Sequence, residues 1–233
     1  MHRLQNRDST NRIAILMTRA AVSGPPSRRE IRRERELEDR RRDTLQAATE
    51  VFAEKGFHDT QINEIDARAE LSLASLYATF DGKEAIYQEV MRSAALRLRD
   101  DVRARLALPA GADTRLALLI EAFFDYFERN RSLLRILLAG TRGLPWKLRE
   151  RTGEGANQIL DEFYRRLVEL CREVVEERAL EDIDPEALCA AVVGAVTHFA
   201  AWVLEEHPER RLVDAAPAVQ AIFARVVRNG ARP

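Results

Sequence analysis

The chain has 233 residues, and 46% of them are apolar, so it can bury a sizeable core and general disorder is excluded. Ala, Leu, Arg and Glu predominate, while Gly and Pro fall between periodic stretches, which predicts an all-α protein. Cys171 and Cys189 cannot form a disulfide framework, and no His/Cys spacing resembles a zinc site. No segment approaches a membrane span, so we expect a cytoplasmic protein.

Charge is unevenly distributed, although the net charge is only −1. Residues 1–42 contain 12 Arg, no Lys and 6 acidic residues, a net charge of +6. The remaining 191 residues carry 25 basic and 32 acidic side chains, a net charge of −7. A basic N-terminal end on an acidic body favours contact with a polyanion, and a solvated, partly disordered tail is the alternative interpretation.

The first 26 residues show no apolar period, so we expect a flexible leader over 1–26, with Met17 as an alternative translation start. Ser27 and Glu30 have the spacing of a capping box, which predicts a helix from there to Lys55, ended by Gly56. Three more predicted helices follow at short intervals: Gln61–Ala69 capped by Thr60, Leu73–Thr79 capped by Ser72, and Lys83–Leu106 opened by Asp81 and Glu84.

The rest of the chain predicts five further helices and one irregular stretch. The helices are expected at Asp113–Arg129, Ser132–Ala139, Glu154–Arg178, Pro185–Glu206 and Ala215–Arg228, and the irregular stretch at Gly140–Pro145. Asp184 followed by Pro185 is a cap with proline at the first helical position. We place one domain over 27–90 and a larger helical domain over 91–230, with the boundary inside one long helix.

The two short helices at 61–69 and 73–79 have helix-turn-helix spacing, in which the second helix fits a DNA major groove. Many helical hairpins share this spacing, so a DNA-binding helix-turn-helix is identified from the residues around it. They are Ala47-Ala48, Phe52, Lys55-Gly56-Phe57, Thr60, Ile65, Ala69, Leu71-Ser72, Ser75-Leu76-Tyr77, Phe80 and Lys83-Glu84. This stretch resembles the N-terminal signature of the TetR family of bacterial transcription regulators.

The resemblance implies an all-α homodimer that binds double-stranded operator DNA through its N-terminal third and a small molecule through the rest, with no cofactor and no metal. We call the predicted helix-turn-helix region the reading unit. Its core is expected to contain Phe52, Ile65, Leu71, Leu76 and Phe80. DNA contacts are expected from Arg41, Arg42, Thr60, Ser72, Leu73, Ala74, Ser75, Tyr77, Thr79 and Lys83. Thr60 and Lys83 would meet phosphates, whereas a packing role for Tyr77 and plain surface charge for Lys83 are the alternatives.

Several positions depart from the family pattern. Asp66 stands where Ala is usual and needs a partner such as Arg42 or Arg68, or an exposed setting. Glu70 stands where Gly makes the turn, so either a left-handed residue is tolerated at a cost of roughly 1 kcal/mol or the turn differs. The predicted reading helix has no Lys or Arg for guanine readout.

Without those cations, base contacts would come from the Ser75 and Thr79 hydroxyls and from apolar contacts between Leu73 or Ala74 and thymine methyl groups. The arginines before the reading unit would supply phosphate contacts; they are Arg28, Arg29, Arg32, Arg33, Arg40, Arg41 and Arg42. We therefore expect an A/T-leaning operator and strongly salt-dependent binding.

The predicted ligand site lies between the middle helices and is mainly apolar. Its candidate residues are Phe123, Phe127, Leu137, Leu138, Trp146, Phe163, His198 and Trp202. They suit a hydrophobic effector such as a fatty acyl group, an aromatic compound or a hydrophobic drug. His198 is either a polar anchor or a hydrogen-bonded structural histidine.

The resemblance also implies dimerisation through the last two helices. Residues 187–196 are rich in small residues and Val219, Ile222, Phe223 and Val226 form an apolar stripe, which suits such packing; the alternative is that both belong to the core of one chain. An enzyme is not expected, because the sequence has no nucleophile–base constellation, glycine-rich phosphate loop or paired metal ligands. The remaining alternative is a TetR-shaped dimer that has lost specific DNA binding and acts as a ligand- or protein-binding module.

Overall fold

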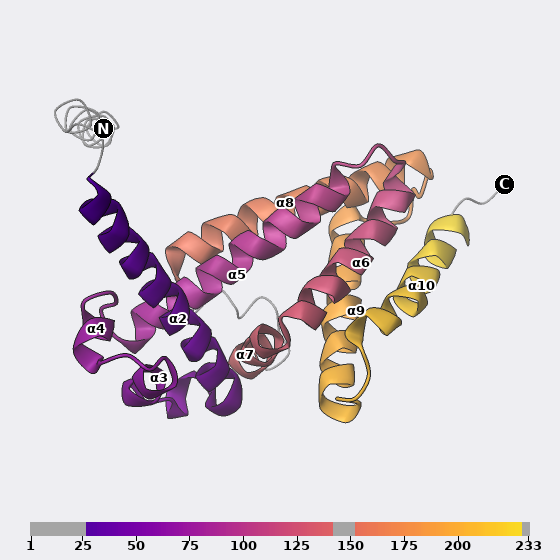
Figure 1. Cartoon of the computed structure of the whole chain (residues 1–233). Helices are drawn as coiled ribbons and strands as arrows, with labels where there is room; N and C mark the ends of the chain where they lie inside the picture. The colour runs from indigo at the N-terminus through magenta and orange to yellow at the C-terminus, as the bar shows by residue number, and fades with distance from the viewer. Residues whose placement is uncertain (1–26, 142–151, 230–233) are drawn as a thin grey trace, which may run out of the picture. The chain divides into compact units, whose positions relative to one another are not determined.

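The structure, a computed structural model, describes residues 27–141 and 152–229, and every regular element within these two ranges is helical (Figure 1). The predicted all-α fold is therefore confirmed. The predicted leader (1–26) and Trp146 lie outside the described residues. The chain divides into two units, residues 1–43 and residues 44–233, and each is described by itself.

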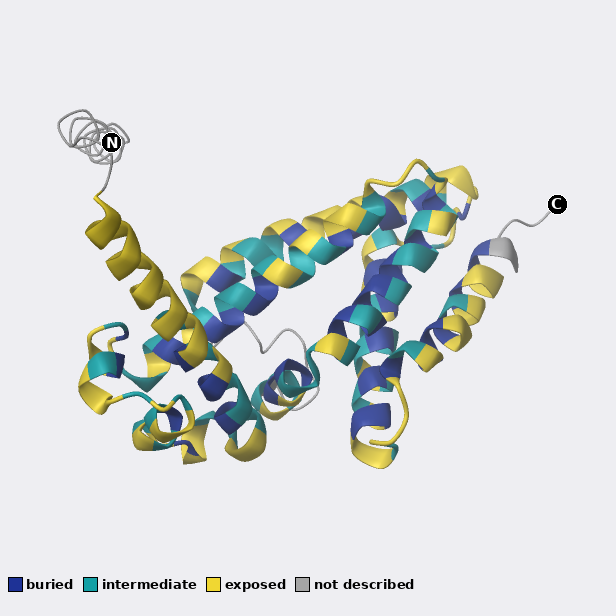
Figure 2. Ribbon diagram, in the orientation of Figure 1, coloured by how far each residue is buried: buried dark blue, intermediate teal, exposed yellow. Residues whose placement is uncertain are grey.

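The described part of the first unit is the N-terminal half of helix α2 (Arg28–Asp59). The predicted capping box is present: the Ser27 amide donates to Glu30 Oε2 at 2.7 Å, and the Glu30 amide donates to Ser27 Oγ at 3.3 Å. All side chains from 27 to 40 are exposed (Figure 2). This segment therefore contributes helix and charge but no core.

The second unit begins with the reading unit, which contains the rest of α2, α3 (Ile62–Arg68), α4 (Leu73–Tyr77) and the start of α5 (Lys83–Leu106). Four of the five predicted core residues are buried, namely Phe52, Ile65, Leu76 and Phe80, while Leu71 is half-buried. Gly56 interrupts α2 with a φ of 77°, as expected of a helix-ending glycine.

The larger part of this unit is arranged around α6 (Ala112–Arg129). Helix α6 packs against α5, α8 (Gly153–Glu177), α9 (Pro185–Glu206) and α10 (Ala216–Asn229), and its Phe124 is fully buried. Helix α7 (Arg131–Thr141) and the short 3-10 helix η2 (Leu212–Ala215) complete the set. Figure 1 shows α5 and α8 running side by side along this unit.

The predicted helix boundaries agree with the structure to within two residues, except that the first helix was predicted to end at Lys55 and ends at Asp59, beyond the non-helical Gly56. Two predicted caps and the predicted irregular stretch also differ. Gly82, with a φ of 101°, precedes α5 in place of the predicted cap Asp81. Gln61 precedes α3 in place of Thr60. Helix α7 continues to Thr141, past the predicted irregular start at Gly140, because an isolated Gly does not by itself end a helix. The domain boundary near residue 90 stays a prediction, since α5 passes through it unbroken.

Helix α9 requires one correction. Its length and composition are those of a helix that could cross a membrane, contrary to the expectation that no segment approaches a span. Its cap is the predicted one, because Asp184 Oδ1 accepts from the Glu186 amide at 2.6 Å and from the Ala187 amide at 3.3 Å. One face of α9 is buried in the core, with Val192, Val196 and Val203 at 2% exposure or less. This is the pattern of a core helix with one uncovered apolar side.

Candidate functional site

Helix α4 presents a small, uncharged surface. Tyr77 is 53% exposed and Leu73 is 41% exposed, and Ser72, Ala74 and Ala78 are exposed beside them. On the opposite face Leu76 is fully buried, which fixes α4 against the core. About half of Tyr77 is therefore accessible to a partner.

The hydroxyl groups on α4 are largely used within the helix. Ser72 Oγ accepts from the Ser75 amide at 3.2 Å and so caps α4, as predicted. Thr79 Oγ1 donates to the Ser75 carbonyl at 3.2 Å and is half-buried. Thr79 could donate a hydrogen bond to a base only if this bond broke, and its side chain is half-buried, so the exposed Tyr77, Leu73 and Ala74 are the better placed of the predicted readers.

Thr60 has a different position from the predicted one. It is 2% exposed, and its hydroxyl donates to the Gly56 carbonyl at 2.7 Å. The first turn of α3 is instead closed by Glu64, whose Oε2 accepts from the Gln61 amide at 2.9 Å. The Thr60 side chain thus ties the end of α2 and is not available to a phosphate.

Lys83 holds the reading unit together. Its Nζ donates to the carbonyls of Phe57 at 2.7 Å, His58 at 3.2 Å and Thr60 at 2.7 Å, and it lies 4.6 Å from the centre of the Phe57 ring. An ammonium group has three N–H donors, and all three are used. The predicted phosphate clamp is corrected: Lys83 caps the α2–α3 connection from the first residue of α5.

Two departures from the family pattern have structural outcomes. Glu70 has a φ of 54°, so the left-handed turn is kept with a non-glycine residue. Arg68 is not a partner for Asp66, because it pairs with both oxygens of Glu54 at 3.0 Å and with Glu50 at 3.2 Å. These bonds raise the pKa of Arg68 and lower the pKa of Glu54. Asp66 is half-buried.

The reading unit is acidic. Residues 45–90 contain nine acidic residues and only three basic ones, Lys55, Arg68 and Lys83, a net charge of −6. Each of the three is engaged: Lys55 pairs with Glu64, and the other two have the partners given above. By contrast, residues 28–43 carry eight arginines and six acidic residues. Arg42 of that segment lies 2.9 Å from Asp39 and 3.7 Å from Asp43.

An apolar cavity of about 180 Å³ lies among α5, α6, α7, α8 and α9. Its lining residues are Met91, Ala94, Ala95, Leu98, Phe123, Tyr126, Phe127, Leu133, Leu137, Leu160, Phe163, Tyr164, Leu167, Val193 and Thr197. The rings of Phe123 and Phe163 meet edge to face at 6.0 Å, and those of Phe123 and Phe127 stack at 6.3 Å. The predicted apolar site between the middle helices corresponds to this cavity.

The polar groups of the cavity are mostly bonded to the backbone. Tyr126 Oη donates to the Ala94 carbonyl at 2.8 Å, and burial raises the pKa of Tyr126 to about 12. Thr197 Oγ1 donates to the Val193 carbonyl at 2.8 Å. Such a lining favours an apolar ligand segment over a charged one.

The structure brings together four of the eight predicted ligand residues: Phe123, Phe127, Leu137 and Phe163. Leu138 packs against the core without lining the cavity. His198 and Trp202 are exposed, so the geometry corrects their predicted role: they lie on the side of α9 that faces away from Val193 and Thr197. The α5 residues that line the cavity were not among the predicted ones, and Ala94-Ala95, the one pair of adjacent alanines in α5, was the available signal.

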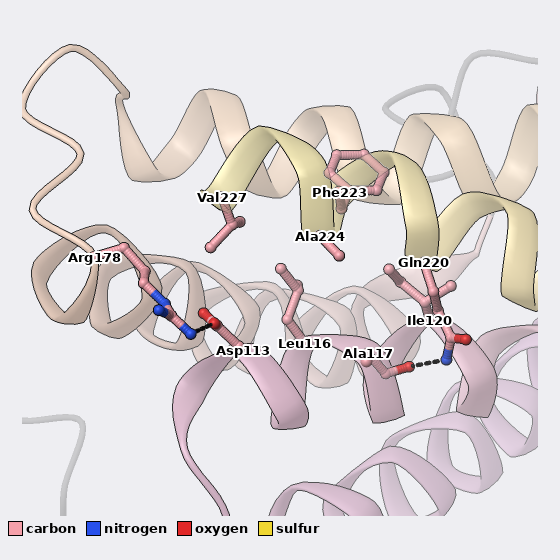
Figure 3. Close-up of a pocket in the computed structure, with 9 residues that line it drawn as sticks. All are labelled: Asp113, Leu116, Ala117, Ile120, Arg178, Gln220, Phe223, Ala224 and Val227. Carbon is pink, nitrogen blue, oxygen red and sulfur yellow. Dashed lines mark hydrogen bonds and ion pairs between the residues drawn. The ribbon is translucent and has the colours of Figure 1, made fainter. Parts of the chain in front are cut away.

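A second hollow of about 240 Å³ lies between α6 and α10 (Figure 3). Leu116, Ile120, Phe223 and Val227 form its apolar walls, and an ion pair between Arg178 and Asp113 closes one end. Gln220 Nε2 donates to the Ala117 carbonyl at 2.8 Å at the other end. The ion pair and the hydrogen bond each connect α6 to another part of the fold, so we assign this hollow to the packing of α10 against α6.

Helices α9 and α10 each expose largely apolar side chains. On α9 the exposed stripe contains Ala187, Ala191, His198 and Trp202, and a Cβ at Gly194 would meet nothing within 4 Å. On α10, Ile222 is 57% exposed and Val226 is 42% exposed. We call this set of residues the α9–α10 face.

Residues 45–90 match the model of the bacterial regulatory proteins of the tetR family. The transcriptional activator FasR of Mycolicibacterium smegmatis is 34% identical over 43% of this chain, and the chain spans about half the length of FasR, 46%. The transcriptional regulator RutR of Escherichia coli is 27% identical over 85% of both chains.

Among solved structures, FadR of Bacillus subtilis in complex with stearoyl-CoA has the same fold. Its TM-score is 0.63 at 20% identity, with 78% of this chain and 96% of the FadR chain covered. The matched range 45–90 coincides with the reading unit built around α3, α4 and the start of α5. Residues 45–90 are therefore similar to the bacterial regulatory proteins of the tetR family, and the chain as a whole shares the fold of FadR.

Proposed function

We propose that the protein is a ligand-responsive transcription regulator, acting as a repressor, that binds a palindromic operator as a homodimer and is released by a mainly apolar small molecule. The observation that carries this proposal is the double use of α5. Its first residue, Lys83, holds the reading unit, and its Met91, Ala94, Ala95 and Leu98 line the cavity. One helix therefore connects the surface of α4 to the ligand space.

Helix α5, which lines the cavity, also packs directly against the helix-turn-helix region. Tyr87 of α5 packs its ring against Phe52 at 5.4 Å and Phe57 at 5.0 Å, both in the reading unit. A Cβ built on Gly140 of α7 would lie 3.4 Å from Tyr87 Oη, so the end of α7 also approaches this ring. A ligand that changes the packing of α7 against α5 would therefore act on the reading unit.

The homodimer is supported by the α9–α10 face. An apolar helix with one side uncovered is unfavourably exposed to water, and a second copy of the same face would cover it. A twofold dimer also matches a palindromic operator with half-sites at about one helical turn or a multiple of it. Ala191→Arg would place a charge in this contact, and light scattering should then report a monomer where the wild type is a dimer.

The ligand class is supported by the cavity and by the similarity to fatty acid regulation in Bacillus subtilis, seen both in a solved structure and in a sequence match. The cavity has an apolar lining whose hydroxyls on Tyr126 and Thr197 already donate to carbonyls. FadR of Bacillus subtilis was solved with stearoyl-CoA, and the fatty acid metabolism regulator protein of Bacillus subtilis is 24% identical over 70% of this chain. We therefore favour a fatty acyl group over an aromatic compound or a drug.

A gel-shift titration against the DNA upstream of its own gene, with excess nonspecific competitor, tests DNA reading. Wild type should give a discrete complex that Tyr77→Ala weakens about tenfold, because the side chain is exposed on α4. Leu108→Ala is the matched control, since it truncates a 48% exposed side chain outside the reading unit. Equal weakening in both variants would count against α4 as the reader.

The acidic reading unit also favours a second candidate, a dimer of this fold that has lost specific DNA binding. A net charge of −6 over 45–90 opposes phosphate contact. Failure of wild type to retain any sequence in a genome-wide binding selection would favour this candidate, whereas one competitor-resistant site would exclude it.

A further inference from the structure

A basic groove follows the contact between α5 and α8. It has a volume of about 360 Å³ and is lined by Arg99, Val102, Arg103, Leu106, Ala107, Glu162, Phe163 and Arg166. Three of these residues are basic and one is acidic, and Val102, Leu106 and Phe163 supply apolar surface. The groove thus combines guanidinium groups from two helices with an apolar wall.

The three arginines are not equally engaged. Arg99 donates twice to the adjacent Asp100 Oδ1, at 2.9 and 2.7 Å, and Arg166 lies 3.0 Å from Glu169. Arg103 is exposed, and no hydrogen bond or ion pair of its guanidinium is found among the described residues. Its forked donors match a phosphate or carboxylate geometrically, as do those of Arg166.

Phe163 lines both this groove and the apolar cavity. The cavity also uses Leu98, the residue directly before Arg99 of the groove, so the two spaces adjoin along α5 as well. The cavity alone, at about 180 Å³, is smaller than the ~300–1,000 Å³ usual for ligand sites, whereas cavity and groove together reach that range.

We infer that the groove is the head-group half of the ligand site and that the ligand is an acyl chain with a phosphate-bearing head group. The acyl chain lies in the cavity, and Arg103 and Arg166 bind the phosphate outside Phe163. This inference rests on the ligand class proposed above and deepens it. A coenzyme A thioester and a lysophospholipid share this chemistry, and a free fatty acid lacks the phosphate.

Isothermal titration calorimetry of the full chain with four probes tests the assignment: dodecanoyl-CoA, dodecanoyl lysophosphatidic acid, dodecanoate and coenzyme A. Wild type is compared with Arg103→Ala/Arg166→Ala. The control is Arg165→Ala/Arg172→Ala, which removes two exposed arginines of α8 that do not line the groove. The groove variant should bind the phosphate-bearing acyl probe about tenfold more weakly, with dodecanoate affinity unchanged and the control like wild type.

Arginine-dependent binding of dodecanoyl-CoA identifies a thioester as the source, and arginine-dependent binding of the lysophosphatidic acid alone identifies a phospholipid. Either result supports the assignment. It is overturned if neither probe binds wild type, if the groove variant binds as well as wild type, or if the control is weakened as much as the groove variant. Because the titration contains no DNA, it is independent of whether the gel shift succeeds.

Discussion

In the proposed function, the arginine-rich segment 28–43 and the reading unit 45–90 would supply different requirements of DNA recognition. The reading unit supplies shape: a buried Leu76 fixes α4, and exposed Tyr77 and Leu73 project from it. Its net charge of −6 and its engaged cations give it no evident attraction for phosphates. The segment 28–43 has eight arginines on an exposed helix. The difference indicates that affinity and sequence reading can be altered separately.

The largest expected effect comes from neutralising Arg28, Arg29, Arg32, Arg33 and Arg40 to Gln. Affinity for the operator should fall on the order of 100-fold at 0.1 M salt, and the slope of log K against log salt should fall by about 0.9 for each phosphate that the variant no longer neutralises. Fluorescence anisotropy at several salt concentrations measures both. The matched Arg→Lys variant should keep most of the slope, and an unchanged slope in the Gln variant would break the division proposed here.

Lys83→Met should destabilise the protein by about 2 kcal/mol, because it removes a charged donor from three carbonyls. The melting temperature should fall by roughly 4–8 °C for a protein of this size. Lys55→Met, which removes only an exposed pair with Glu64, is the control and should change it by less than ~2 °C. A variant with a normal melting temperature and a reduced salt slope would restore Lys83 as a phosphate contact.

Glu70→Gly should stabilise the reading unit by about 1 kcal/mol, because φ is 54° at a residue with a Cβ. Glu70→Gln separates backbone strain from charge, since it removes the carboxylate and keeps the strain. Ala179→Gly, at a φ of 49° outside the reading unit, should show a similar gain in denaturant unfolding. A gain in Glu70→Gln equal to that in Glu70→Gly would show that charge repulsion, and not strain, is relieved.

The smallest effect is expected for Leu73→Ala. Leu73 is 41% exposed on α4, so its truncation should leave stability unchanged and weaken operator binding about threefold through one apolar contact to a base. Competition with operators in which single A·T pairs are replaced by G·C pairs locates that contact. If Leu73→Ala weakens binding equally to all sequences, the residue does not read a base.

Most of the fold could be predicted from local sequence signals. Asp184-Pro185, Ser27 with Glu30, and Ser72 cap helices as their residue types require. The roles of Thr60 and Lys83 could not be predicted, because each depends on carbonyls brought together by the fold: Lys83 bonds to residues 23 to 26 positions earlier. A sequence pattern identifies a donor but not which acceptors will surround it.

Four of the eight predicted ligand residues line one apolar cavity, and the ligand site itself stays a prediction. The aromatic cluster at Phe123 and Phe127 marks an apolar helix face that must be covered, which sequence periodicity can detect. The sides of α9 could not be assigned, because this helix is apolar nearly all round. The direction of His198 and Trp202 was therefore open, and the structure places both on the α9–α10 face.

Helix α5 contains no Gly or Pro in its 24 residues, and this makes it a stiff lever. Its length is about 36 Å, so a tilt of roughly 5° displaces one end by about 3 Å relative to the other. In a dimer two such levers carry two α4 helices, and their separation must match major grooves about 34 Å apart. A ligand that rotates α5 by a few degrees therefore needs no large rearrangement of the cavity to abolish simultaneous binding of both half-sites.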